Sequence, residues 1–405
     1  MKKLGFVYDD SLVKDMCKSK KFGERMEIVM DLMRSYGLFR YFSRIPPLNM
    51  ESFESDLMTI LGFFSEEYIR RFLDFARSYE EALDSSVLLN DSLEEFGLSY
   101  DCSGFEGVYS YAMSSVRGTI AAVDALLKNQ CTAAINWFGG WHHGKRASAS
   151  GFCYFNDIGI AIMRILQKDP TLKILYIDLD LHHGDGVEEA FAYSRNVVTF
   201  SVHHAARGFY PGTGNCDSSS GYGPGRFSAF NFPMNEGATD ENFIKHLPIV
   251  LSAIEQSLKP NFVILQLGAD GLCTDPHKIF NLTASSQCAF VHLTSLVLSW
   301  NLPTLILGGG GYNFPDTARL WTCVTHSVIQ HFHPETYFPS QNLYFSSPIE
   351  IKEDIPEINS FKEFGPDFTL SISPGLRPNK NTEEYLETQV KRLLCQLEEY
   401  KVFRK

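Results

Sequence analysis

Asp178-Leu179-Asp180-Leu181-His182-His183-Gly184-Asp185 follows directly on a mostly apolar, β-branched run at residues 173–177. That run predicts a buried strand. Side chains alternate along extended backbone, so Asp178, Asp180 and His182 should share one face if the strand continues. Carboxylates gathered this densely are costly without a cation between them. The stretch therefore predicts a metal site at the end of a strand.

Four further clusters of histidines, aspartates or glycines also follow predicted strands. They are Gly139-Gly140-Trp141-His142-His143, His203-His204, Gly268-Ala269-Asp270 and Gly308-Gly309-Gly310-Gly311-Tyr312. In an open parallel α/β sheet, ligands bind outside the carboxyl ends of the strands. We therefore expect all five clusters to contribute to one shared site.

Short apolar runs alternate with longer segments of helical period, which is typical of βα units and a parallel sheet. The predicted strands are residues 132–136, 173–177, 196–202, 261–267 and 303–307. The predicted helices are residues 23–35, 66–79, 109–127, 157–166, 241–257 and 286–300. Right-handed crossovers would place helices on both faces of the sheet. We expect an α/β fold with a central, mostly parallel, multi-stranded sheet.

The length of 405 residues allows two or three domains, but no linker rich in Pro, Gly or Ser divides the chain. We therefore expect a single domain over residues 1–405, with the N-terminal hundred or so residues packed on the sheet. Residues 212–226 are rich in Gly and Ser and predict an exposed loop. Residues 334–380 hold many of the prolines and should wrap over the surface, ahead of a terminal helix at 382–400.

The formal net charge of the chain is −12. Nucleic-acid affinity depends on Lys and Arg that neutralise phosphates, so this charge argues against direct nucleic-acid binding and favours a basic peptide as partner. The nine cysteines are scattered without C-x-x-C spacing, which argues against a disulfide framework and a zinc finger. No signal peptide and no run of about 18 apolar residues is apparent. We expect a soluble protein of the nucleus, the cytoplasm or both.

Asp270 can complete an Asp, His, Asp set with Asp180 and His182. Three protein ligands with one open position are the arrangement of a catalytic zinc site, whereas structural sites are closed by four ligands and usually contain Cys. The same oxygen and nitrogen donors tolerate iron(II). The alternative is an acidic, hydrogen-bonded loop that holds no metal.

The histidine pair and the glycine-flanked tyrosine suggest proton transfer and acyl chemistry. His142 and His143 could act as base and acid near a metal if Asp178 and Asp185 fix their tautomers. Tyr312 fits a phenol donor to a developing oxyanion better than part of a phosphate-binding loop, because no Lys-Ser/Thr follows the glycines. The alternatives are a histidine pair that fills the surface or core, and a turn tyrosine packed on the core.

Taken in order, these motifs closely resemble those of the zinc-dependent histone deacetylases. The matching stretches are Trp141-His142-His143, Ala149-Ser150-Gly151-Phe152-Cys153-Tyr154, residues 178–186, Gly208-Phe209-Tyr210-Pro211-Gly212-Thr213-Gly214, Gly268-Ala269-Asp270 and residues 308–312. The resemblance covers nearly the whole chain, is strongest over residues 95–325, and is to class I enzymes of the histone deacetylase 8 type. It implies an arginase/deacetylase-like α/β fold.

The resemblance implies a role for each matching residue. The metal ligands would be Asp180, His182 and Asp270, and the catalytic residues His142, His143, Tyr312, Asp178 and Asp185. The residues that hold the substrate would be Asp101, Gly151, Phe152, Phe209, Gly310 and His277. A structural potassium ion would be bound at Asp178, Asp180, His182, Ser201 and Val202. Arg25 would line a cavity beneath the metal.

The implied reaction is zinc-dependent hydrolysis of N6-acetyl-lysine in histone tails and other acetylated proteins. Phe138, Gly144 and His277 depart from the residues usual in the family, which leaves the pocket shape and the acyl-chain length open. Three alternatives remain: a deacylase for longer acyl chains, an acetylpolyamine amidohydrolase, and a non-catalytic acyl-lysine reader or scaffold. The sequence does not indicate an oligomeric state.

Overall fold

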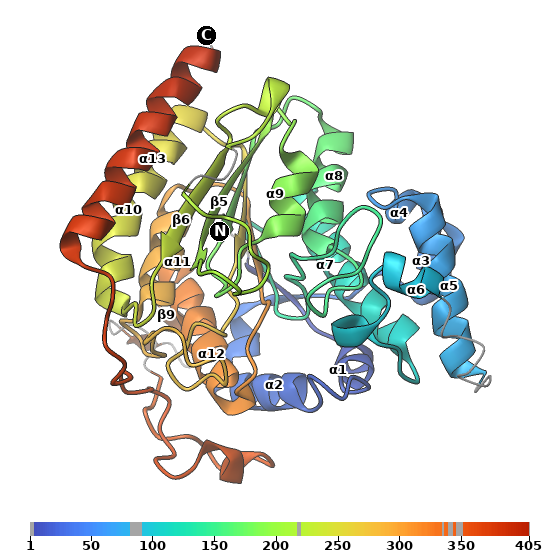
Figure 1. The fold of residues 1–405 in the computed structure, drawn as a ribbon. Coiled ribbons are helices and arrows are strands. Elements are labelled where there is room, and N and C mark those ends of the chain that lie inside the picture. Colours follow the sequence, from blue (N-terminus) through green and yellow to red (C-terminus); the bar gives the residue numbers. More distant parts are fainter. Residues whose placement is uncertain are drawn as a thin grey trace.

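The computed structural model describes residues 4–81, 91–216, 220–333, 336–338, 343–345 and 351–404. A central eight-stranded sheet runs through it, and every pair of neighbouring strands in that sheet is parallel (Figure 1). In spatial order, its strands are β2 (Ser43–Ile45), β1 (Leu4–Val7), β3 (Ala133–Asn136), β8 (Thr304–Leu307), β7 (Phe262–Gln266), β4 (Ile174–Asp178), β5 (Val197–His204) and β6 (Ala229–Met234). The expected α/β fold with a parallel sheet is confirmed.

Helices cover both faces of the sheet (Figure 1). One face carries α7 (Val108–Leu127), α8 (Asp157–Lys168) and α9 (Asp185–Phe191), and the other carries α10 (Asp240–Leu258), α11 (Ala289–Ser299) and α12 (Phe314–Phe332). The remaining helices are α1 (Asp10–Met16), α2 (Arg25–Ser35), α3 (Met50–Ser55), α4 (Leu57–Ile60), α5 (Glu66–Glu80), α6 (Asp91–Glu95) and α13 (Glu383–Arg404). Within the described ranges, every helix is too short or too polar to cross a lipid bilayer.

The five strands expected from the sequence are the five central ones, β3, β8, β7, β4 and β5. All five residues of β4 are buried, as its mostly apolar sequence requires for a strand covered on both faces. The other three strands of the sheet were not expected: the edge strands β2 and β6, and β1 next to β2. Residues 336–338 and 343–345 form a separate antiparallel pair, β9 (Thr336–Phe338) with β10 (Leu343–Phe345).

Side chains of α13 cover the outer edge of β6. The Gln396 side chain donates a hydrogen bond of 2.7 Å to the carbonyl of Ala229, and Arg392 donates to the carbonyl of Asn231. The Tyr385 hydroxyl donates a hydrogen bond of 2.8 Å to the Pro233 carbonyl. These carbonyls alternate along the strand and point away from β5, so α13 occupies the place of a further strand.

Residues 351–382 connect this helix to the rest of the chain without a further α-helix or a strand of the main sheet. Ile355, Phe364 and Leu370 are buried there and hold the segment against the body of the protein. Most of residues 334–350, which fall in the same expected surface wrap, lie outside the described residues. The expected loop at 212–226 contains only the short helix Gly223–Gly225 in its described part.

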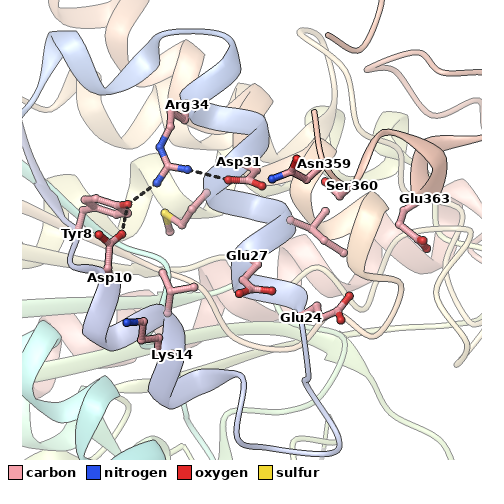
Figure 2. Close-up of a pocket in the computed structure, with 13 residues that line it drawn as sticks. Tyr8, Asp10, Lys14, Glu24, Glu27, Asp31, Arg34, Asn359, Ser360 and Glu363 are labelled. Atoms are coloured by element: carbon pink, nitrogen blue, oxygen red, sulfur yellow. Dashed lines mark hydrogen bonds and ion pairs between the residues drawn. The ribbon is translucent and has the colours of Figure 1, made fainter. Parts of the chain in front are cut away.

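A polar hollow of about 540 Å³ lies along α2 (Figure 2). Arg34 forms a 2.7 Å ion pair with Asp31 and donates a hydrogen bond to the hydroxyl of Tyr8, which in turn contacts Asp10 (Figure 2). Asp10, Asp31 and Arg34 are therefore linked to one another, through Tyr8, on one wall of the hollow. Arg25, at the start of the same helix, is buried and faces the candidate site instead.

Candidate metal and catalytic site

The candidate site lies where the central strands end. The order β3-β8-β7-β4-β5 places the residues that follow these strands at one edge of the sheet. His203 and His204, at the end of β5, are the exception to the expected convergence. The His203 ring bonds to the Gly214 carbonyl at 2.9 Å, and His204 packs against Phe209, so neither belongs to the metal cluster.

Asp180, His182 and Asp270 form a buried group whose ligand atoms all lie within 4.8 Å of one another. The His182 Nδ1 atom is 2.9 Å from Asp270 Oδ2. The backbone of Gly310 donates to Asp180 Oδ2 at 3.0 Å, and a Cβ atom at Gly310 would lie only 2.3 Å from Asp270 Oδ2. A glycine is therefore required where this turn crosses the two carboxylates.

The electrostatics of the cluster fit a bound cation. Burial and the neighbouring Asp180 carboxylate raise the pKa of Asp270 to about 6. Burial opposes a charge on His182, but its hydrogen bonds to the two aspartates outweigh burial and raise its pKa to about 10. Two buried carboxylates that repel each other around one imidazole are stabilised when a divalent cation binds between them.

Two histidine–carboxylate pairs lie beside this cluster. His142 Nδ1 is 2.7 Å from Asp178 Oδ2, and His143 Nδ1 is 2.7 Å from Asp185 Oδ1. The Nε2 atoms of the two histidines are 3.0 Å apart, and His142 Nε2 is 3.8 Å from the Asp180 carboxylate. Each carboxylate fixes one ring nitrogen and leaves Nε2 toward the site.

The two histidines differ in charge. Burial opposes protonation of His142, but Asp178 and Asp180 outweigh it and raise the pKa of His142 to about 9. Burial and the charge of His142 lower the pKa of His143 to about 4, although Asp185 acts in the opposite direction. At neutral pH, these shifts favour a single positive charge on the pair, carried by His142, with His143 as the neutral member.

Tyr312 follows the glycine turn after β8, and its ring contacts His277 and Phe152 at centroid distances of 4.9 and 5.9 Å. Burial raises the pKa of its phenol well above the usual value, so the hydroxyl remains a donor. Asp275 holds the turn in place. One carboxylate oxygen accepts from the Tyr312 backbone N–H at 2.8 Å, and the other lies 2.7 Å from His277 Nδ1.

We expect Asp275→Asn to lower kcat by about tenfold to a hundredfold, because the Tyr312 backbone loses a charged acceptor that contributes about 1.5–3 kcal/mol. Metal content and melting temperature should change little. Steady-state kinetics with elemental analysis measures both quantities, and exposed Asp367→Asn is the matched control. An unchanged kcat in Asp275→Asn would remove Asp275 from this positioning role.

Several of the expected substrate-holding residues lie close to the metal cluster or to one another. The Phe209 ring stacks on His182 with a centroid distance of 5.2 Å. The Asp101 carboxylate accepts from the Gly151 backbone N–H at 2.8 Å. Phe152 adopts a positive φ of 65°, a strained conformation for a residue with an aromatic side chain.

Two residues that contact His143 and Tyr312 were not expected from the sequence. The Tyr210 ring lies 4.9 Å from the His143 ring, and its hydroxyl bonds to Ser150. The Lys21 ammonium lies 4.9 Å from the Tyr312 ring centre. Tyr210 follows Phe209 in the glycine-rich motif at residues 208–214, so its position near the site could have been predicted from the sequence. Lys21 reaches the site from a distant part of the chain.

Three supporting residues were also missed. Gln266, the last residue of β7, donates to Asp180 Oδ2 at 2.9 Å, and the Tyr176 hydroxyl donates to Asp178 at 2.7 Å. Asp157 accepts hydrogen bonds from the backbone N–H groups of Gly140 and Trp141 and so holds the loop before the histidines. Gln266 is the one polar residue in an otherwise apolar strand, and this feature of the sequence could have identified it.

Arg25 lies behind the site rather than in it. Its guanidinium donates hydrogen bonds to the carbonyls of Gly309 and Gly311 at 3.0 and 3.1 Å. It is 1% exposed, and burial lowers its pKa. Arg25 was expected to line a cavity beneath the metal. The structure shows it as a buried cation whose hydrogen bonds hold the glycine turn in place.

Comparison with known proteins identifies the family. A model of the histone deacetylase domain matches residues 21–328. Histone deacetylase 8 of Danio rerio is 35% identical over 94% of this chain and 92% of its own length. Histone deacetylase 8 of Xenopus laevis is 39% identical over 74% and 85%, and human histone deacetylase 1 is 36% identical over 91% and 69%. The resemblance expected from the motifs is confirmed, and the chain belongs to the histone deacetylase family.

Proposed function

We propose that this chain removes acetyl groups from N6-acetyl-lysine in histone tails and other proteins by metal-dependent hydrolysis. The observation that carries the proposal is the position of two histidine–carboxylate pairs, 3.0 Å apart at their Nε2 atoms, directly beside the Asp180, His182 and Asp270 cluster. Metal-dependent hydrolysis of an amide uses a cation, a base and an acid within reach of one carbonyl. These groups meet that requirement.

Zinc is the ion that we propose for the Asp180, His182 and Asp270 cluster, with iron(II) as the alternative. The oxygen and nitrogen donors suit both ions. When bound, the ion supplies a Lewis acid that polarises the acyl carbonyl and lowers the pKa of water. A potassium ion is proposed for the carbonyl groups near Asp178, Asp180, His182, Ser201 and Val202, because Asp178 and Ser201 pair directly across β4 and β5.

The protein side chains would move the protons. His143 holds its Nδ1 proton toward Asp185, so its Nε2 atom can accept a proton from the attacking water and later give it to the leaving amine. His142, protonated and held by Asp178, adds positive charge beside the reacting carbonyl. The Tyr312 hydroxyl would donate a hydrogen bond to the developing oxyanion.

The substrate would enter between aromatic side chains. We propose that Phe152, Phe209 and Tyr210 line the passage for the acyl-lysine stem, and that Asp101 and Gly151 bind amide groups of the substrate. Gly310 and His277 would complete the wall near Tyr312. An uncapped lysine ammonium would lose its hydration in this passage, which favours the neutral acylated form.

Metal removal provides the direct test. We expect the purified chain to contain about one equivalent of zinc or iron, and chelation to lower its activity on an acetyl-lysine peptide by more than about a hundredfold, because a Lewis acid contributes several kcal/mol to such a step. Elemental analysis before and after chelation, followed by re-addition of each ion, checks this. Full activity in a sample shown to be free of metal would contradict the proposal.

The same assay separates the remaining candidates. The net charge of −12 would also attract a cationic polyamine, so acetylspermidine is compared with the acetyl-lysine peptide. Peptides with longer acyl chains test the tolerance of the pocket near Phe138. A chain that binds these peptides without hydrolysing any of them would act as a reader or scaffold.

We also propose that the chain forms one domain and acts in the nucleus, the cytoplasm or both. Buried apolar residues from Leu4 to Tyr400 belong to one contiguous core, which supports a single domain. All nine cysteines are free thiols, which suits a reducing compartment.

A further inference from the structure

Asp185 joins the proposed general base to a lysine near the surface. One of its carboxylate oxygens lies 2.7 Å from His143 Nδ1, and the other lies 3.4 Å from the Lys145 ammonium. The same ammonium lies 2.9 Å from a carboxylate oxygen of Glu189. The exposed fraction of the side chains rises from 7% for Asp185 to 35% for Lys145 and 65% for Glu189. A chain of charged groups therefore leads from the candidate site to the surface.

The backbone fixes both ends of the ion pair between Lys145 and Asp185. The Lys145 N–H donates a hydrogen bond of 2.9 Å to the Ser148 carbonyl, which holds the loop after the histidines. Asp185 is the first residue of α9, and the next residue, Gly186, packs directly on that loop. A Cβ atom at Gly186 would lie only 2.6 Å from the His142 carbonyl oxygen. A larger residue there would push α9 away from the loop, so the glycine keeps the two charges close together.

Asp178, the partner of the other histidine, is held without a cation. It is fully buried, and its carboxylate accepts hydrogen bonds from the Tyr176 hydroxyl at 2.7 Å and from the Asp180 backbone N–H at 3.1 Å. Among the described residues, the Asp185 carboxylate has only the ring of the proposed base and the Lys145 ammonium as hydrogen-bond or ion-pair partners. Lys145 therefore takes the place that a hydroxyl and a backbone N–H take beside Asp178.

A surface pocket of about 310 Å³ borders Asp185, Lys145 and Glu189. The described residues that line it include none that we assign to the acyl-lysine passage. Water in such a pocket competes for a carboxylate oxygen, and a carboxylate that turns toward water no longer fixes the imidazole beside it. An ammonium on the outer oxygen opposes this turn, because a charge-assisted contact is stronger than one to water. A change at Lys145 should therefore reach the substrate only through Asp185.

We propose that Lys145 is a positioning residue for the hydrolysis. Its ammonium holds the outer oxygen of Asp185, so that the inner oxygen keeps the Nδ1 proton of His143 and leaves Nε2 free to accept a proton from water. Lys145 itself neither touches the substrate nor exchanges a proton. This inference rests on the proposed hydrolase function, in which His143 is the base.

The charge of Asp185 agrees with this role. Burial raises the pKa of Asp185, but its hydrogen bond with His143 and the neighbouring charges, that of Lys145 among them, outweigh burial and lower the pKa to about 2. Asp185 is therefore an anion at neutral pH and can be held by the ammonium.

Lys145→Met tests the role in the zinc-loaded full chain, because methionine keeps an apolar stem and removes the charge. On an acetyl-lysine peptide, kcat should fall by about fivefold, or about 1 kcal/mol, the upper part of the range for a partly exposed ion pair. KM should change by less than about twofold, since the lost contact lies outside the passage. The assay is run at about pH 8, far above the pKa of His143 of about 4, so a change in the charge of the base does not contribute.

Two further variants separate positioning from a general effect of charge. Lys145→Arg should restore most of the rate, because the pocket leaves room for a guanidinium beside Asp185. Arg146→Met is the matched control and should leave kcat within about twofold of the original. Arg146 is the next residue along the chain, its side chain is exposed, and it forms no ion pair within the described ranges. This control removes the same charge from the same loop without touching Asp185.

A double variant shows whether Lys145 acts through Asp185. Asp185→Asn removes the carboxylate that the ammonium holds and should itself lower kcat. Adding Lys145→Met to it should cause no further loss, because two changes that remove the same interaction are not additive.

The ring protons of the histidines give a readout that does not depend on turnover. In the zinc-loaded chain, the Nδ1 proton of His143 can be assigned in NMR spectra by its absence in His143→Ala. In Lys145→Met, this proton should exchange with water at least about fivefold faster, because Asp185 then turns toward solvent more often. Arg146→Met should leave its exchange unchanged.

Three results would overturn the inference. The first is a kcat and a ring-proton exchange in Lys145→Met that both equal those of the original chain. The second is a loss that Lys145→Arg does not restore or that Arg146→Met reproduces, and the third is a further loss when Lys145→Met is added to Asp185→Asn. Failure of the proposed function looks different, because the original zinc-loaded chain would then hydrolyse no acetyl-lysine peptide, while the ring-proton comparison would still decide whether Lys145 holds Asp185.

Discussion

Tyr312→Phe should lower kcat on an acetyl-lysine peptide by about 10²–10³-fold, the range observed when one donor to an oxyanion is removed. The change deletes only the hydroxyl and keeps the ring contacts with Phe152 and His277. KM should change little, because the lost interaction develops mainly in the transition state. Steady-state kinetics over a range of peptide concentrations separates the two constants.

Exposed Tyr193 offers the control for this experiment, since Tyr193→Phe removes a hydroxyl from the surface. Both variants should keep the melting temperature and metal content of the original chain. A Tyr312→Phe variant with a nearly normal kcat would show that its hydroxyl does not stabilise the oxyanion.

His143→Ala should lower kcat by about 10²–10⁴-fold, the contribution expected of a positioned general base. His143 is the neutral histidine of the pair, because burial and the adjacent charge of His142 lower its pKa to about 4. His142 stays protonated up to about pH 9 and cannot replace it as a base. In the original chain, activity should therefore fall as the pH drops toward about 4 and as it rises past about 9.

To check the loss of kcat and the pH dependence, we would measure the rates of the original chain and of His143→Ala across this pH range. His292→Ala, at an exposed position on α11, is the control for loss of an imidazole. If His143→Ala retained both a high rate and the original pH profile, His143 would not be the base.

The sequence predicts the centre of the fold better than its edges. The five central strands, β3, β8, β7, β4 and β5, are buried on both faces, so their apolar runs stand out. β6 lies at one edge and contains Pro233, a residue that is tolerated at an edge because the ladder there needs fewer donors. β2, at the other edge, has only three residues, and two of them are exposed. Edge strands of this kind lack the pattern by which central strands are recognised.

The residues of the candidate site also differ in whether the sequence predicts them. Asp180 and His182 are close in sequence, so the chain itself keeps them near each other, although β4 ends at Asp178 and both residues lie in the loop that follows. The ties made by Asp275, Asp157 and Gln266 join segments far apart in the chain, and no local pattern marks them.

The hydrogen bonds from α13 to β6 have a consequence for self-association. An open strand edge is a template on which a second molecule can add its own strand. Gln396, Arg392 and Tyr385 occupy successive outward carbonyls of β6 and so block that addition. The final helix therefore protects the protein from growing into strand-linked aggregates, and a chain shortened before residue 383 should precipitate even though its metal ligands are intact.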